Sequence, residues 1–186
     1  MKLVLASASP RREELLRRIA PEFDIVPSRI EEPKNGRPAW RALEAARRKA
    51  RAVATHTDGL IIAADTLVVL RSHVLGKPGT AADAAEMLRR LSGRSHRVIT
   101  ALCLIETQRG SERAAVERTR VHFRPLSESD IARYLESGEY EGKAGAYGIQ
   151  GRAAAFVDWI RGDYTNVMGL PVSRLTLLLR ELGLDV

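Results

Sequence analysis

The sequence contains few residues of several kinds, and each shortage excludes a class of protein. Its single cysteine, Cys103, excludes an internal disulfide, and the apolar run VITALCLI around it favours a small buried hydrophobic role over a reactive thiol. No apolar run approaches the roughly 18 residues that would span a bilayer. The four histidines are dispersed, without the pair spacing of zinc ligands. These absences predict a cytoplasmic protein with no membrane contact and no zinc site.

Aromatic residues are also scarce, at 5% of 186 residues, whereas the formal net charge is +7. The charge indicates an anionic partner, which is either nucleic acid or a small phosphate compound. Single-stranded nucleic acids stack on aromatic platforms, and the chain carries no stacking motif such as an RNP box. We therefore expect no stable nucleic-acid binding, and a basic nucleic-acid-binding protein is the non-enzyme alternative.

Lysine is rare among the basic residues, with five lysines among the 30 lysines and arginines. Lys49 lies in a helix predicted over 38–56, and its neighbours three and four residues away are small and apolar: Ala45, Ala46, Ala52 and Val53. Such a lysine either snorkels to the rim of its apolar face or serves a functional site, and the pattern favours the two readings equally.

The length suits one domain over 1–186 with a sizeable core. Hydrophobic periodicity, capping boxes at Thr80 and Ser127, and glycine stops predict interleaved helices and strands. The helices are expected over 10–19, 38–56, 80–93, 127–138 and 171–183. The strands are expected over 2–6, 23–26, 60–70, 96–107, 113–124 and 154–160, with RGDYTNVMG as a turn. The pattern indicates a mixed α/β fold with an antiparallel hairpin in the middle.

The stretch LASASPRREELL sets two arginines into the opening turn of a helix. Ser9 is a favourable N-cap and Pro10 a favourable first residue, so Arg11 and Arg12 fall at the positive end of the helix dipole. Each arginine should cost about 0.3–1 kcal/mol there unless an anion neutralises it. The motif therefore predicts a bound anion.

Further polar residues stand at constrained places. Asp65 closes the buried run LIIAAD, and Glu31 and Glu32 lie in a loop. Lys77 lies in GKPG, which is no Walker motif because the required glycine and hydroxyl positions hold other residues. The absence of a G-x-S-x-G elbow argues against a serine hydrolase. Cations, a helix N-terminus and carboxylates together are what a triphosphate with Mg²⁺ or Mn²⁺ requires.

Eight motifs, in this order and spacing, resemble the Maf family of nucleoside triphosphate pyrophosphatases, also called septum-formation inhibitor proteins. The motifs are LASASPRREELL, IEEP, RRKA, AADTLVV, LGKP, SGRSHRVIT, AYGIQG and NVMGLPV. They span nearly the whole chain, and together they are far more specific than any one of them.

The resemblance implies a metal-dependent hydrolase that cuts nucleoside triphosphates between the α and β phosphates, giving a monophosphate and pyrophosphate. It implies an α/β fold of the Maf and ITPase-like kind, an elongated mixed β-sheet with flanking helices, in which two lobes surround a central cleft. Family members are often homodimers, so a homodimer is expected. House-cleaning of modified nucleotides and a link to the arrest of cell division are the roles implied.

The resemblance also assigns site residues position by position. The phosphate-binding residues implied are Ser7, Ser9, Arg11 and Arg12. The polar catalytic centre implied comprises Glu32, Lys49, Asp65 and Lys77. Within it Asp65 matches the proton acceptor, and Glu32 and Asp65 are the expected metal ligands.

The motif AYGIQG resembles the branch of the family that acts on dTTP and UTP. Arg11, Thr66 and Gln150 match the positions that separate the branches. A primary amide offers a donor and an acceptor together, which complements a uracil or thymine edge, although a glutamine between glycines is also a common turn residue. The alternatives are the branch acting on 7-methylguanosine triphosphate and a broad pyrophosphatase of modified nucleotides.

Overall fold

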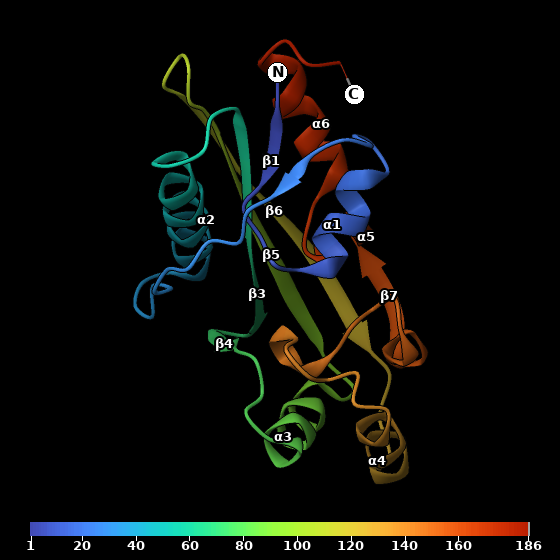
Figure 1. The fold of residues 1–186 in the computed structure, drawn as a ribbon. Helices are drawn as coiled ribbons and strands as arrows, with labels where there is room; N and C mark the ends of the chain where they lie inside the picture. Colours follow the sequence, from blue (N-terminus) through green and yellow to red (C-terminus); the bar gives the residue numbers. More distant parts are fainter. Residues whose placement is uncertain (186) are drawn as a thin grey trace. The chain divides into compact units, whose positions relative to one another are not determined.

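The computed structural model describes residues 1–185, which form a mixed α/β fold (Figure 1). The strands are β1 Leu3–Leu5, β2 Asp24–Ile25, β3 Leu60–Leu70, β4 His73–Leu75, β5 Ser95–Glu106, β6 Ser111–Phe123 and β7 Val157–Arg161. The α-helices are α1 Pro10–Arg17, α2 Pro38–Ala54, α3 Ala81–Leu91, α4 Glu128–Glu136, α5 Tyr164–Met168 and α6 Val172–Glu181. The strand order is β2-β1-β3-β5-β6-β7, and β4 pairs with β3. The predicted fold class is confirmed.

The chain divides into two compact units. Unit 1 comprises Met1–Thr66, Thr100–Glu117 and Gly169–Val186, and unit 2 comprises Leu67–Ile99 and Arg118–Met168. The long strands β3, β5 and β6 each contribute residues to both units. These strands are long enough to carry polar residues among apolar ones, such as Asp65 and Thr66 in β3 and Thr100 in β5.

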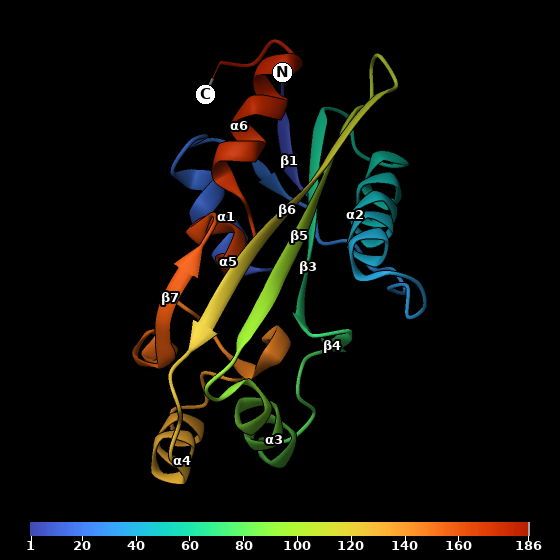
Figure 2. The same cartoon turned by 180° about the vertical axis from the view of Figure 1, so that it is seen from behind.

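Unit 1 contains three parallel strands, with β1 between β2 and β3, as well as parts of β5 and β6. Helix α2 lies on one face of these strands, and helices α1 and α6 lie on the other (Figures 1 and 2). Because both faces are covered, β3 is almost continuously apolar and buried. Helix α2 buries only small side chains, which are Ala42, Ala45, Ala46, Ala50 and Val53. Small residues let this helix pack closely on the sheet.

Unit 2 contains the antiparallel pairs β3–β4 and β6–β7 and the helices α3 and α4, which contact each other. Thr80 and Ser127 cap these two helices through complete capping boxes with Asp83 and Asp130. The capping boxes predicted from sequence are therefore confirmed. Aromatic rings fill the core of this unit, and Phe123 packs edge to face against both Tyr147 and Phe156.

Three segments of unit 2 differ from the sequence predictions. The strand expected over 154–160 begins only at Val157, because Arg152–Phe156 form a 3₁₀ helix that buries Ala153 and Phe156, three residues apart. The expected turn RGDYTNVMG contains helix α5, whose first amides donate to the carboxylate of Asp163. No strand is expected between the strand over 60–70 and the helix over 80–93, but the short strand β4, three residues long, lies there.

Cys103 is buried, and burial raises the pKa of its thiol to about 12, so the thiolate that a nucleophile needs is not formed. Among the described residues no helix combines the length and the apolar character that crossing a bilayer demands.

Candidate active site

The centre of the candidate site is a lysine held between two carboxylates in unit 1. Lys49 Nζ, on α2, lies 2.7 Å from Glu32 Oε1 and 2.6 Å from Asp65 Oδ1. The Lys49 side chain is 12% exposed and that of Asp65 is 7% exposed, so the ammonium is directed inward. Of the two interpretations that the sequence left open, the low exposure of Lys49 and its contact with Asp65 favour a role in a functional site over snorkelling to the rim. Lys49 lies on the apolar face of α2, which packs on the sheet, and its ammonium therefore reaches Asp65 on β3.

Asp65 lies within β3, which continues to Leu70, and not at the end of a strand. Burial raises the pKa of the Asp65 carboxyl, and the charge of Lys49 opposes this shift. A carboxylate with a raised pKa binds a proton more readily than an ordinary aspartate at neutral pH, which suits a general base. Glu32, the third member of the centre, is exposed on the loop before α2.

Arg12 is fastened to unit 1 by three hydrogen bonds. Its Nε donates to the carbonyl of Gly169 at 2.9 Å, Nη1 to Ser7 Oγ at 3.2 Å and Nη2 to Thr66 Oγ1 at 3.1 Å. Thr66 Oγ1 also lies 3.0 Å from Thr100 Oγ1. Arg12 thus links Ser7 of the predicted phosphate loop to Thr66, the residue after Asp65, and holds these two parts of the site in place.

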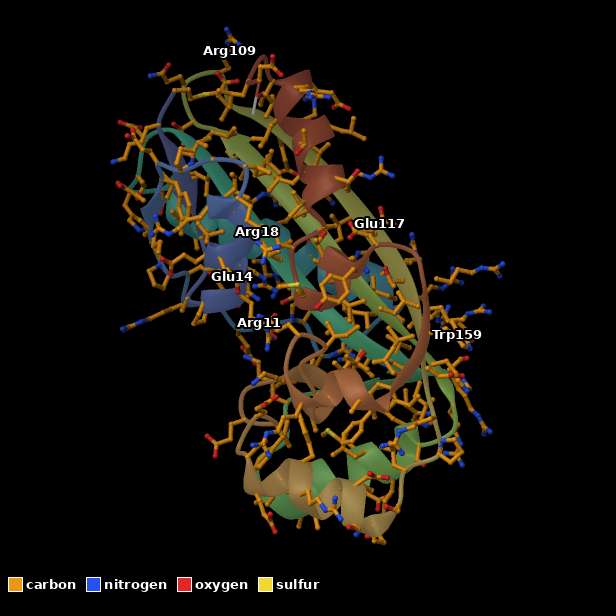
Figure 3. All side chains as sticks on the ribbon, turned by 90° about the vertical axis from the view of Figure 1, so that its right-hand side faces the viewer. Arg11, Glu14, Arg18, Arg109, Glu117 and Trp159 are labelled. Atoms are coloured by element: carbon orange, nitrogen blue, oxygen red, sulfur yellow. The ribbon has the colours of Figure 1, made fainter. Side chains whose placement is uncertain are left out.

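The first turn of α1 presents the other residues of the predicted phosphate loop. Ser9 occupies the N-cap position with extended backbone, as expected, but its side chain makes no capping hydrogen bond. The Ser9 amide donates to Ser7 Oγ at 3.2 Å. Figure 3 shows Arg11 at the start of α1, with Glu14 and Arg18 further along the helix. The positive end of the dipole and the Ser9 hydroxyl therefore remain suited to an anion.

Lys77 and Gln150 belong to unit 2, whereas the other predicted site residues belong to unit 1. Both side chains are exposed. Their loops are joined within unit 2, because the amide of Gly145 donates to the carbonyl of Gly76 at 2.9 Å. This hydrogen bond connects the two loops at Gly76, the residue before Lys77.

Two residues of the polar network in unit 1 were not singled out from the sequence. Thr100 is a fully buried hydroxyl in the apolar strand β5, and Gly169 offers its carbonyl to Arg12 with a φ of 113°. A Cβ at Gly169 would approach Thr66 Oγ1 to 3.4 Å, in a backbone region that side chains rarely adopt. A threonine in the otherwise apolar run VITALCLI is a signal that could have identified Thr100.

The donor set at the centre fits a metal ion that is shared with phosphate. Within residues 1–185 there is no cluster of three or more histidine, cysteine or acidic side chains that could cage an ion. Glu32 and Asp65 supply two carboxylates, and Mg²⁺ or Mn²⁺ sites commonly combine one or two carboxylates with substrate phosphates and water. These two residues therefore fit an ion that arrives with a nucleotide.

Comparison with known proteins finds a family model that covers nearly the whole chain. The model of the family described as Maf-like protein matches residues 2–182. The dTTP/UTP pyrophosphatase of Moorella thermoacetica is 52% identical, over 100% of this chain and 97% of that protein. The dTTP/UTP pyrophosphatase of Thermococcus gammatolerans is 50% identical, over 99% and 98%. A HAM1 protein from Coxiella burnetii has a similar fold, with a TM-score of 0.54, 18% identity and coverage of 97% and 99%.

Proposed function

We propose that this chain, which belongs to the family of Maf-like proteins, hydrolyses dTTP and UTP to the monophosphate and pyrophosphate. The observation that carries the proposal is the buried contact of Lys49 Nζ with Asp65 Oδ1 at 2.6 Å, next to Glu32. A buried carboxylate with an adjacent ammonium combines a proton acceptor with a cation for phosphate oxygens in one site.

In the proposed reaction each residue of the site has a task. Asp65 accepts a proton from a water molecule while the water oxygen forms a bond to the α-phosphorus. The bond from the α-phosphorus to the oxygen that bridges to the β-phosphate breaks, and pyrophosphate leaves with the bonding electron pair. Lys49 neutralises negative charge that develops on the phosphate oxygens. Ser9, Arg11 and the N-terminus of α1 bind and orient the triphosphate.

A divalent cation completes this account. Glu32 and Asp65 would hold Mg²⁺ or Mn²⁺, and when bound the ion neutralises phosphate charge and polarises the phosphorus for attack. The adjacent pair Glu31 and Glu32 provides a matched test of the assignment, because Glu31 is exposed and lies 3.6 Å from Lys34 instead of Lys49. Glu32→Gln should raise the metal concentration needed for half-maximal activity by roughly tenfold or more. Glu31→Gln should leave it unchanged, and equal effects would contradict the assignment.

Base preference is assigned to Gln150 in unit 2. Its amide can pair with the donor and acceptor of a uracil or thymine edge. The names of the relatives at 50% and 52% identity support dTTP and UTP over 7-methylguanosine triphosphate. Lys77, on the neighbouring loop of unit 2, supplies an exposed ammonium for a phosphate.

A panel of nucleoside triphosphates tests the proposal. The protein with Mg²⁺ or Mn²⁺ is incubated with dTTP, UTP, GTP and 7-methylguanosine triphosphate, and the products are separated by chromatography. We expect monophosphate and pyrophosphate, fastest from dTTP and UTP. Diphosphate and orthophosphate would contradict cleavage at the α-phosphate, and faster cleavage of the methylated purine would contradict the base assignment.

A further inference from the structure

Gln150 lies in a tight turn whose two ends are both glycines. The amide of Gly151 donates to the carbonyl of Gly148 at 3.1 Å, which closes the turn Gly148–Gly151. Within the turn, Ile149 is buried and Gln150 is exposed. A short turn with flanking glycines has little stiffness of its own, so the direction of the glutamine depends on what holds the turn.

The residue before the turn is anchored in the core of unit 2. The hydroxyl of Tyr147 and Nε2 of His96, on β5, form a hydrogen bond of 2.7 Å. Both side chains are buried, at 5% and 2% exposure, and both rings pack edge to face against Phe123. Tyr147 thereby fixes the backbone position at which the turn begins.

Two more hydrogen bonds hold the turn from the side of α4 and the chain that follows it. The amide of Gly148 donates to the hydroxyl of Tyr134 at 3.3 Å, and the amide of Arg152 donates to Glu139 Oε2 at 2.8 Å. Before the turn, Ala146 has a φ of 62°, a left-handed conformation that non-glycine residues rarely adopt. That conformation persists only where the surroundings hold it, and the contacts of Tyr147 are next to it.

We propose that His96 is a positioning residue for base selection: through its hydrogen bond to Tyr147 it holds the turn that presents Gln150. This inference rests on the proposed function, in which Gln150 reads the base. His96 and its partner Tyr147 are both buried in unit 2, so His96 is not placed to contact the nucleotide itself. Its effect on the reaction therefore passes through the backbone of residues 147–151.

The chemistry of the pair explains why a polar contact occupies an aromatic core. Burial raises the pKa of Tyr147 and lowers the pKa of His96 to about 4, so both groups are neutral at physiological pH. A neutral hydroxyl and imidazole form a directional bond, whereas two phenylalanines would fill the same space with less directional preference. Replacing both partners with apolar rings is often nearly neutral for stability. The hydrogen bond between His96 and Tyr147 is thus suited to fixing the position of Tyr147 and of the turn that follows it.

Hydrogen exchange provides a test that needs no activity. Four variants are compared with the wild type by NMR: His96→Phe, Tyr147→Phe, the double variant, and His122→Phe as a matched control. His122 is also a histidine of unit 2, but it stacks on Trp159 and bonds to Ser95. We expect the amides of Gly148 and Gly151 to exchange roughly fivefold to tenfold faster in the first three variants. Wild-type exchange at both amides in the double variant would overturn the inference.

Base selection is measured on the same variants. We expect the ratio of kcat/KM for dTTP over 7-methylguanosine triphosphate to fall by roughly tenfold in His96→Phe and in Tyr147→Phe, in the same direction as in Gln150→Ala. Because the two residues act through one contact, the double variant should lose no more than either single variant. His122→Phe should keep the wild-type ratio.

The outcomes separate this inference from the proposed function. Equal losses for all nucleotides together with a lower Tm would show that His96 only supports the fold. An altered ratio in Gln150→Ala with a wild-type ratio in the folded double variant would overturn the positioning role and leave the proposed function intact. A wild-type protein that gives no monophosphate and pyrophosphate from dTTP would overturn the proposed function itself, whatever the exchange rates at Gly148 and Gly151.

Discussion

The Nζ atom of Lys49 lies 2.6 Å from Oδ1 of Asp65, and the two side chains are only 12% and 7% exposed. Removing two charges from water costs several kcal/mol per ion, so an ion pair of this kind is a weak source of stability. An apolar pair would serve the core of unit 1 as well. The pair is therefore better explained by chemistry than by folding, and that explanation makes predictions for both its members and their neighbours.

Replacing Asp65 should remove the base and keep the fold. An asparagine side chain has the shape of an aspartate but cannot accept the proton, so Asp65→Asn should lower kcat by about 10²–10⁴. Asp58→Asn, which changes an exposed aspartate just before the same strand, is the control and should keep full turnover. Steady-state kinetics at saturating metal decide the point, and near-normal turnover in Asp65→Asn would remove this residue from the mechanism.

Arg12 should matter for stability as well as for activity. Arg12→Ala would remove the Arg12 hydrogen bond from the buried carbonyl of Gly169 and one hydrogen bond each from the hydroxyls of Ser7 and Thr66. An unsatisfied buried polar group costs about 1–3 kcal/mol, so urea titration should show a loss of that size. Arg18→Ala, which breaks an exposed pair with Glu14 on the same helix, should cost no more than about 0.5 kcal/mol. Lost activity with unchanged stability would instead favour direct contact between Arg12 and phosphate.

His96 should make the protein sensitive to acid. Burial, followed by the nearby His122, lowers the pKa of His96 from 6.5 to about 4, so below pH 6.5 the unfolded chain binds a proton that the folded chain excludes. The stability contributed by neutral His96 is present above pH 6.5 and is lost as the pH falls towards 4. The loss is limited to roughly 3 kcal/mol, at about 1.36 kcal/mol for each tenfold change in proton affinity.

The pH effect is measured as a difference between proteins, because other carboxyls also titrate in acid. The free energy of unfolding from urea titrations at neutral pH and near pH 4.5 should fall more in the wild type than in the double variant His96→Phe with Tyr147→Phe. Parallel losses in the two proteins would mean that His96 is not the group responsible.

Much of the fold could be predicted because its signals are local. The capping boxes at Thr80 and Ser127 are complete within four residues, and the apolar run of β3 is long enough to identify a buried strand. Helix α5 was missed although Asp163, an ordinary N-cap residue, precedes it. The segment Arg152–Phe156 was missed because short apolar runs fit a strand and a 3₁₀ helix equally.

The residues of the candidate site could be proposed from the sequence, but the contacts among them could not be predicted. The spacing of small residues around Lys49 indicates that the lysine faces an apolar surface, but not that two carboxylates meet it there. The partners of Arg12 could not be predicted, because Gly169 is 157 residues away in the chain. The bond between His96 and Tyr147 likewise joins residues 51 positions apart, and neither periodicity nor spacing reports such a distance.

The position at which water attacks tests the account most directly. The protein is incubated with dTTP and a divalent metal in water enriched in heavy oxygen, and the products are analysed by mass spectrometry. If Asp65 activates water against the α-phosphorus, the heavy oxygen enters the thymidine monophosphate and the pyrophosphate stays unlabelled. Label in the pyrophosphate, or release of labelled orthophosphate, would contradict attack at the α-phosphorus and with it the mechanism proposed for Asp65.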